Sequence, residues 1–135
     1  MTQEPGAQAL FDKFGTYILP GRVDDPRRGI DEALEAERIG LGAVWISERF
    51  ALKEPAVLAG AVSEATSRIR INGTFYATMR HPLVTASIAN MMQAMSGNRF
   101  GVMFARAVPG YMKMMGAPAI TMERLAEYIG IFRRL

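Results

Sequence analysis

Four clusters of residues follow the apolar stretches of this sequence, three of them with charged or polar side chains, and these are where chemistry is feasible. The four are Leu19-Pro20-Gly21, Ser47-Glu48-Arg49-Phe50, Thr74 to Thr78 and Ala105-Arg106-Ala107-Val108. Glu48 and Arg49 introduce two charges directly after apolar residues. An arginine keeps its proton near neutral pH, so Arg49 indicates binding of a phosphate or carboxylate rather than proton transfer. A Glu48–Arg49 ion pair at the surface is the alternative interpretation.

The chain has one histidine, His81, and no cysteine. Without cysteine there is no disulfide, no thiolate metal site and no cysteine nucleophile, and the chain fits a reducing compartment. His81 precedes Pro82, and a residue before proline is disfavoured in α geometry and suited to capping a helix. We therefore predict a capping or packing role for His81 rather than a catalytic one.

Methionines gather in the second half of the chain and could suggest a metal site or a flexible binding face. They are Met91, Met92, Met95, Met112, Met114 and Met115. Met91 and Met95 are four residues apart, the spacing of one helix face, and we predict that they pack in the core. Residues 112–115 are predicted to lie in a loop that covers a ligand or stays exposed. Packing is favoured over metal binding, and no metal site is expected.

Short apolar stretches alternate with longer helical ones, and this alternation positions the four clusters. We predict strands over residues 14–19, 43–47, 69–76 and 100–105, and helices over residues 25–39, 55–67, 82–96 and 122–135. Asp25, His81 and Thr121 are the expected caps of three of these helices.

A chain of strand–helix repeats with apolar strands predicts an α/β fold on a parallel sheet with right-handed crossovers. Two architectures use this repeat, an open doubly wound sheet and a (βα)8 barrel of roughly 250 residues. The length of 135 residues by itself favours the open sheet. In both architectures ligands bind at the carboxyl ends of the strands, where the four clusters lie.

The composition limits the class of protein. Half of the 135 residues are apolar and 21% are charged, which excludes a disordered chain and predicts one domain over residues 1–135. The net charge of +3 is interspersed along the chain, so we expect no nucleic-acid partner. No apolar stretch approaches the roughly 20 residues of a membrane span, and the start lacks a signal-peptide pattern. We expect a soluble, cytoplasmic protein without a membrane partner.

From Phe14 to Leu135 the sequence resembles the luciferase-like monooxygenase family, which includes flavin-dependent monooxygenases and oxidoreductases that use the 5-deazaflavin coenzyme F-420. The resemblance rests on an ordered set of motifs: Glu35-Ala36-Glu37-Arg38 before Gly40, Val44-Trp45-Ile46-Ser47-Glu48, Thr66-Ser67-Arg68-Ile69-Arg70, Arg80-His81-Pro82 and Ser96-Gly97-Asn98-Arg99-Phe100. The family has a (βα)8 barrel fold. The resemblance therefore implies that the chain is the N-terminal half of such a barrel, a truncated parallel (βα)4 unit.

The resemblance also implies a site for FMN or coenzyme F-420. The residues expected to bind the cofactor are Glu48, Gly73, Thr74, Arg106 and Ala107. Arg49 is the expected catalytic residue, standing where dehydrogenases of the family have a histidine, and it would meet an anionic group. Gly73-Thr74 falls where the family has a bulge and a non-prolyl cis peptide bond, which is sustained only where a site exploits it.

The fourth strand end departs from the family pattern. Ala105 and Ala107 fall in a run where the family commonly has glycines, which allow close approach to a cofactor phosphate. Val108 stands where dehydrogenase members often have glutamate. The sequence therefore does not support sugar-phosphate dehydrogenase chemistry, whereas reductase or monooxygenase chemistry remains open.

The resemblance implies an oxidoreductase or monooxygenase that uses the reduced cofactor to transfer hydride or activate oxygen on a small organic substrate. The alternative is an inactive, truncated paralogue, or a half-barrel subunit that functions only by pairing. Open strand edges favour a homo-oligomer or a complementary half barrel as the partner.

Overall fold

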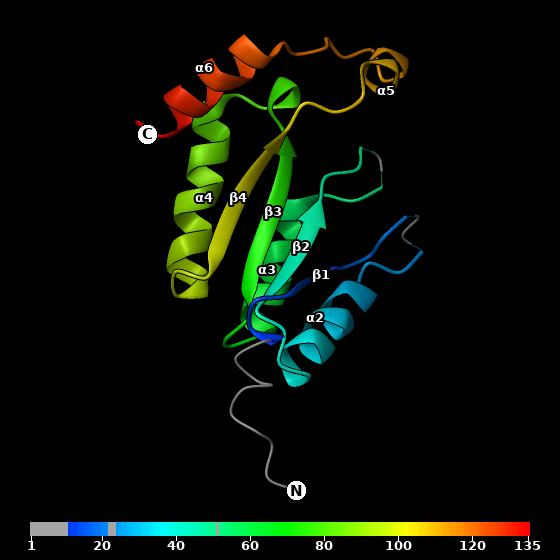
Figure 1. Cartoon of the computed structure of the whole chain (residues 1–135), viewed down its shortest axis with the longest axis vertical. Coiled ribbons are helices and arrows are strands. Elements are labelled where there is room, and N and C mark those ends of the chain that lie inside the picture. Colours follow the sequence, from blue (N-terminus) through cyan, green and yellow to red (C-terminus); the bar gives the residue numbers. More distant parts are fainter. Residues whose placement is uncertain (1–10, 22–23, 51) are drawn as a thin grey trace, which may run out of the picture.

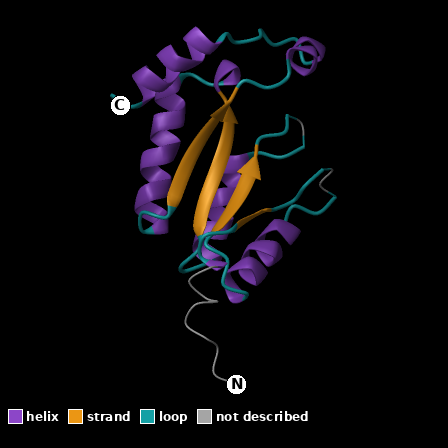
Figure 2. Cartoon of the chain, viewed as in Figure 1, coloured by secondary structure: helices purple, strands orange, loops and turns teal. Residues whose placement is uncertain are grey.

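The computed structural model describes residues 11–21, 24–50 and 52–135 and shows four parallel strands alternating with helices (Figures 1 and 2). The strands are β1 (Gly15–Tyr17), β2 (Ala43–Ser47), β3 (Arg70–Tyr76) and β4 (Phe100–Ala105). The helices are α2 (Arg28–Arg38), α3 (Pro55–Ala65), the 3-10 turn η1 (Ala77–Met79), α4 (Pro82–Ser96), α5 (Pro109–Met114) and α6 (Met122–Phe132). No helix in the described part of the chain is long and apolar enough to cross a membrane.

The strand order decides between the two architectures that the sequence allowed. The sheet has the order β1-β2-β3-β4, and every neighbouring pair is parallel. When sequential parallel strands are joined by crossovers of one hand, each connecting helix falls on the same face of the sheet. A doubly wound sheet has helices on both faces instead. The fold is thus an α/β unit that matches part of a (βα)8 barrel, as the resemblance implied.

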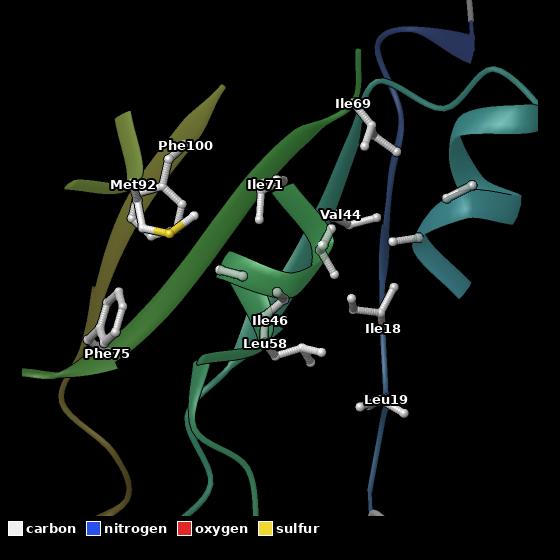
Figure 3. Close-up of a cluster of buried hydrophobic side chains, with 14 residues drawn as sticks. Ile18, Leu19, Val44, Ile46, Leu58, Ile69, Ile71, Phe75, Met92 and Phe100 are labelled. Atoms are coloured by element: carbon white, nitrogen blue, oxygen red, sulfur yellow. The ribbon is translucent and has the colours of Figure 1, made fainter. Parts of the chain in front are cut away.

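Alternate strand residues form one core with α2, α3 and α4 (Figure 3). The strand side chains in this cluster include Val44, Ile46, Ile71 and Phe75, all fully buried. Each such side chain contributes roughly 1.5–3 kcal/mol by leaving water. Gly73 lies in the same row, and a Cβ there would come within 2.9 Å of the Phe75 ring. The glycine therefore makes room for core packing.

The opposite face of the sheet carries no helix from the described residues, and its side chains are half-buried or exposed. They include Tyr17, Trp45, Asn72, Thr74, Tyr76 and Met103. We call this set the open face. Strands of a parallel sheet are normally covered on both sides, so the open face is the interior side of an incomplete barrel.

Two of the family motifs, those that contain Glu37 and Arg99, contact a third, Thr66 to Arg70, at the amino ends of the strands. The Glu37 carboxylate accepts backbone N–H bonds from Arg68 and Ile69 at 2.7 Å each. The Arg99 guanidinium donates to the carbonyls of Ile69 and Thr66 at 3.0 and 2.9 Å. These contacts join α2 and the start of β4 to the start of β3. These three motifs therefore stabilise the end of the sheet opposite the strand carboxyl ends.

Two of the expected helix caps are confirmed and one is wrong. The His81 Nδ1 accepts the Leu83 N–H at 3.2 Å, and the Thr121 hydroxyl accepts the Arg124 N–H at 3.3 Å. The first helix begins at Arg28 rather than at Pro26. Asp25 caps a preceding turn instead, because its carboxylate accepts the Arg27 N–H at 3.0 Å.

The predictions for the methionines need correction. Met91 and Met95 are 62% and 56% exposed, whereas Met92 between them is buried in the core. Residues 112–115 do not form a loop: Pro109 opens α5, and Met112 is fully buried in it. Proline at the first helical position was the available signal for this helix.

Candidate functional site at the carboxyl ends of the strands

The carboxyl ends of β2, β3 and β4 bring several predicted site residues together at one end of the sheet. Thr74 lies between Ser47 and Met103 in the strand register, and Tyr76 pairs with Ala105 one row further. Thr74 and Tyr76 belong to the open face. The exposed Arg49 is the second residue after β2, and the exposed Arg106 is the first after β4. We call this end of the sheet, together with the loops that follow β2 and β4, the rim.

Glu48 follows β2, but its carboxylate is buried beneath the rim and only 4% of the residue is exposed. One oxygen accepts the backbone N–H of Tyr76 at 2.7 Å, and the other accepts the Arg80 guanidinium at 2.6 and 3.0 Å. Arg80 also pairs with Glu54, the N-cap residue of α3. This network ties the ends of β2 and β3 to the start of α3.

The arginine that contacts Glu48 is Arg80, not the neighbouring Arg49. The expected alternative, an ion pair between Glu48 and Arg49, is wrong, because Arg80 forms the ion pair with Glu48. Burial lowers the pKa of Arg80, but the hydrogen bond and charge of Glu48 outweigh it, so the net pKa is raised above its ordinary value. Arg80 therefore remains charged in its pair with Glu48. Arg49 has no part in this pair and is exposed at the rim.

Lys53 is a buried cation that sequence reasoning missed. Its Nζ donates to the carbonyl of Leu19 at 2.8 Å and lies 4.8 Å from the ring centroid of Tyr17. Leu19 has a left-handed φ of 48°, and its N–H donates to Glu32 at 2.7 Å. Such a conformation persists only where the surroundings fix it. Lys53 and Glu32 together hold the chain where it leaves β1.

Aromatic side chains form the second part of the rim that the sequence did not indicate. The rings of Phe50 and Tyr76 have centroids 5.1 Å apart, and Phe50 and Tyr111 are stacked at 6.3 Å. Burial raises the pKa of Tyr76 above its ordinary value, although the charge of Arg49 acts in the opposite direction. The Tyr76 phenol is therefore neutral at ordinary pH. Tyr111 comes from α5, the helix that the sequence prediction lacked.

The loop after β4 begins with Arg106 and Ala107. Ala107 has a φ of 60°, in the left-handed region that favours glycine. The backbone thus makes the turn that glycine would make at less cost. Among the described residues neither Arg106 nor Arg49 has an ion-pair partner.

Gly73 and Thr74 differ from the expectation that came with the resemblance. Both pair in regular register with Val102 and Met103, and no cis peptide bond occurs in the described residues. The expected bulge and cis bond are therefore absent here. Thr74 faces the open side and Gly73 the core, because successive strand residues alternate between faces.

The rim combines two chemical features. Arg49 and Arg106 are cations suited to phosphate or carboxylate groups. The rings of Phe50, Tyr76 and Tyr111 offer flat apolar surface with polar hydroxyl groups. The arrangement suits a ligand that has both a planar ring system and an anionic tail. The described residues contain no cluster of acids and histidine that could hold a metal ion.

Comparisons with known proteins agree with this geometry. The family model for luciferase-like monooxygenase matches residues 6–135. A coenzyme F-420-dependent tetrahydromethanopterin reductase from Methanopyrus kandleri is 26% identical with a TM-score of 0.69, over 78% of this chain and 30% of that chain. No curated protein matches.

Two further solved structures show the same fold. A monooxygenase from Streptomyces bottropensis is 23% identical with a TM-score of 0.74, over 90% of this chain and 42% of that one. The oxygenating constituent of 3,6-diketocamphane monooxygenase from Pseudomonas putida, in complex with FMN, is 22% identical with a TM-score of 0.65, over 76% of this chain and 32% of that one. The chain thus spans less than half the length of each of these three structures.

Proposed function

The chain belongs to the luciferase-like monooxygenase family, and we propose that its rim forms one side of a binding site for FMN or coenzyme F-420. The similar structures include a coenzyme F-420-dependent reductase and a monooxygenase in complex with FMN. Both cofactors join a planar ring system to a phosphate-bearing tail. The observation that supports the proposal is the coincidence of aromatic rings and two arginines at the strand ends.

Each rim residue has a part in this proposal. Arg106 and the left-handed turn at Ala107 hold the phosphate-bearing tail, and Arg49 binds an anionic group of the cofactor or substrate. Thr74 and Tyr76 contact the ring system from the open face. Glu48 acts through the network that holds Tyr76 and Arg80, and Gly73 acts by making room for the core behind Thr74.

The chemistry divides between cofactor and protein. When bound, the reduced cofactor supplies hydride or reacts with oxygen, and the substrate is a small organic molecule above its ring. The residues of this chain bind and orient. Arg49 stays protonated, so it fixes an anionic group without moving a proton. Tyr76 stays neutral and offers a hydroxyl donor at the rim.

Titration of the purified chain with FMN and with coenzyme F-420, followed by fluorescence, tests the proposal. We expect binding of at least one of them at tens of micromolar. Arg106→Met removes a charge-assisted contact worth about 1.5–3 kcal/mol, so it should weaken binding roughly tenfold or more. Arg38→Met is the matched control, because Arg38 is exposed on α2 and pairs with Glu35.

The control variant should bind like the unmodified chain. Equal weakening by both arginine variants would show a nonspecific charge effect and would remove Arg106 from the site. No binding of either cofactor to a folded sample would count against the proposed function itself.

A further inference from the structure

The sheet has two edges without a partner strand in the described part of the chain. β1 pairs only with β2, and β4 pairs only with β3 (Figure 1). An unpaired edge presents backbone N–H and C=O groups that bind another strand readily. The same sheet also lacks cover on its open face. A partner that pairs with both edges would satisfy their backbone groups and would also cover the open face.

The hydrogen-bonding pattern fixes which groups point outward. Ile18 donates its N–H to Trp45, so the N–H of Tyr17 points away from β2. Ile71 donates to the carbonyl of Arg99, so the groups of Val102 and Phe104 point away from β3. In a parallel pair of β4 with β1, the outward N–H of Tyr17 would reach the outward carbonyl of Phe104. This pairing places Ala105 opposite Tyr17.

The stagger of the strands selects the same register. Tyr17, the last residue of β1, is level with Trp45, Asn72 and Gly101. β4 continues from Gly101 to Ala105, four residues further. If each copy contributes a stagger of four residues between β1 and the end of β4, two copies contribute about eight. A stagger of eight residues is the shear of an eight-stranded parallel barrel. The ends of β4 and of a second β1 are then level when Ala105 lies opposite Tyr17.

We propose that a second copy of this chain closes the barrel, with β4 of each copy paired in parallel with β1 of the other. The partner must match both edges and the stagger at once, and a two-fold pair of identical chains does so. The open face becomes the barrel interior, where Tyr17 and Trp45 meet the small residues Gly101 and Ala105. The pairing also places the rims of the two copies at the same end of the barrel.

A groove beside β1 supports this arrangement. Its lining combines Ile18 beside β1 and the apolar Ala36, Ile39 and Leu41 with four charged residues of α2, which are Arg28, Asp31, Glu32 and Glu35. Ile39 is 47% exposed there. In the proposed register Phe104 of the second copy lies opposite Thr16, at the entrance of this groove.

Light scattering during size-exclusion chromatography tests the assembly without any cofactor, so its failure is distinct from failure of the proposed function. We expect twice the 14.9 kDa of one chain at tens of micromolar. Val102→Pro removes an outward N–H without removing a bond to β3, and should yield a folded monomer by circular dichroism. A folded monomeric mass for the unmodified chain would overturn the proposal.

The absence of native cysteine allows a sharper test of the register. The double variant Tyr17→Cys with Ala105→Cys should form disulfide-linked dimers on mild oxidation. Within one chain β1 and β4 are three strand spacings apart, about 14 Å, whereas a disulfide needs Cα atoms within about 7 Å.

The matched control is Tyr17→Cys with Gly101→Cys, which places the second thiol on the same face but four residues lower. We expect at least a tenfold lower yield of linked dimer from it, and the same low yield from the single variant Tyr17→Cys. Equal yields from the two double variants would overturn the proposed closure.

Discussion

At the scale of single residues, buried charges organise the strand ends. Lys53 fixes the carbonyl of Leu19, and Glu48 fixes the N–H of Tyr76, in each case at a residue close to the rim. Both charged groups have hydrogen-bond partners, which is the condition for burying them. Neither needs to touch a ligand to matter, because each sets where a rim residue or its backbone lies.

Lys53→Met tests the holding role of the buried cation. Methionine keeps the apolar stem but leaves the Leu19 carbonyl without its donor, so we expect the free energy of unfolding to fall by about 1–3 kcal/mol. Lys113→Met, on an exposed residue of α5, should change it by less than about 0.5 kcal/mol. Chemical denaturation of both variants measures the difference, and equal values would contradict the role of Lys53.

Two alanines near the end of β4 give a second comparison. Ala107 has a φ of 60°, so Ala107→Gly should raise the free energy of unfolding by about 1 kcal/mol through relief of backbone strain. Ala105 is the last residue of β4 and has ordinary strand geometry, so Ala105→Gly should instead lower it by about 0.5–1 kcal/mol. Thermal denaturation shows the two signs, and a loss of stability in both variants would contradict a strained Ala107.

At the scale of elements, two polar side chains connect βα units at the amino ends of the strands. Glu37 connects α2 to β3, and Arg99 connects the loop before β4 to the end of α3 and the start of β3. The Thr85 hydroxyl and the Tyr128 phenol, 2.7 Å apart, join α4 to α6. Glu37 and Arg99 therefore act as connectors at the end of the sheet where stability rather than binding resides, whereas the contact between Thr85 and Tyr128 lies near the carboxyl ends of the strands.

Glu37→Gln tests the connector between α2 and β3. Partial burial raises the pKa of Glu37, but hydrogen bonds from the Ile69, Ser67 and Arg68 N–H groups outweigh it, so the net pKa lies below its ordinary 4.5. A lowered carboxyl pKa gives stability that is present above pH 4.5 and lost as pH falls through the folded-state value. At pH 7 the variant should lose about 1–3 kcal/mol of the free energy of unfolding.

The same variant has a distinct pH signature. The stability difference between the unmodified chain and Glu37→Gln should shrink as pH falls below 4.5, because the native carboxylate becomes protonated. Denaturation midpoints across pH 3–7 record this. A difference that stays constant over that range would show that the carboxylate charge is not what matters.

At the scale of the whole molecule, one face of the sheet is a finished core and the other is the open face. α2, α3 and α4 bury the first, whereas Trp45, Asn72 and Thr74 remain accessible on the second. The rim lies at one end of that open face, so the proposed closure of the barrel would also enclose the proposed cofactor site.

The sequence by itself determined the order of the four strands and the four long helices, and their bounds to within three residues. β2, α4 and β4 agree with prediction to the residue, because proline, capping residues and apolar periodicity act over a few neighbours. The parallel α/β class followed from the same local signals. α5 was missed because its six residues are too few to show a period.

Only the tertiary structure decided how the site is built. It paired Glu48 with Arg80 instead of its neighbour Arg49, buried Lys53 against the end of β1, and brought Tyr111 to Phe50. It also placed every sheet-covering helix on one face. These outcomes depend on contacts between residues that lie far apart along the chain, and no local pattern encodes which of several similar side chains will meet once the strands are aligned.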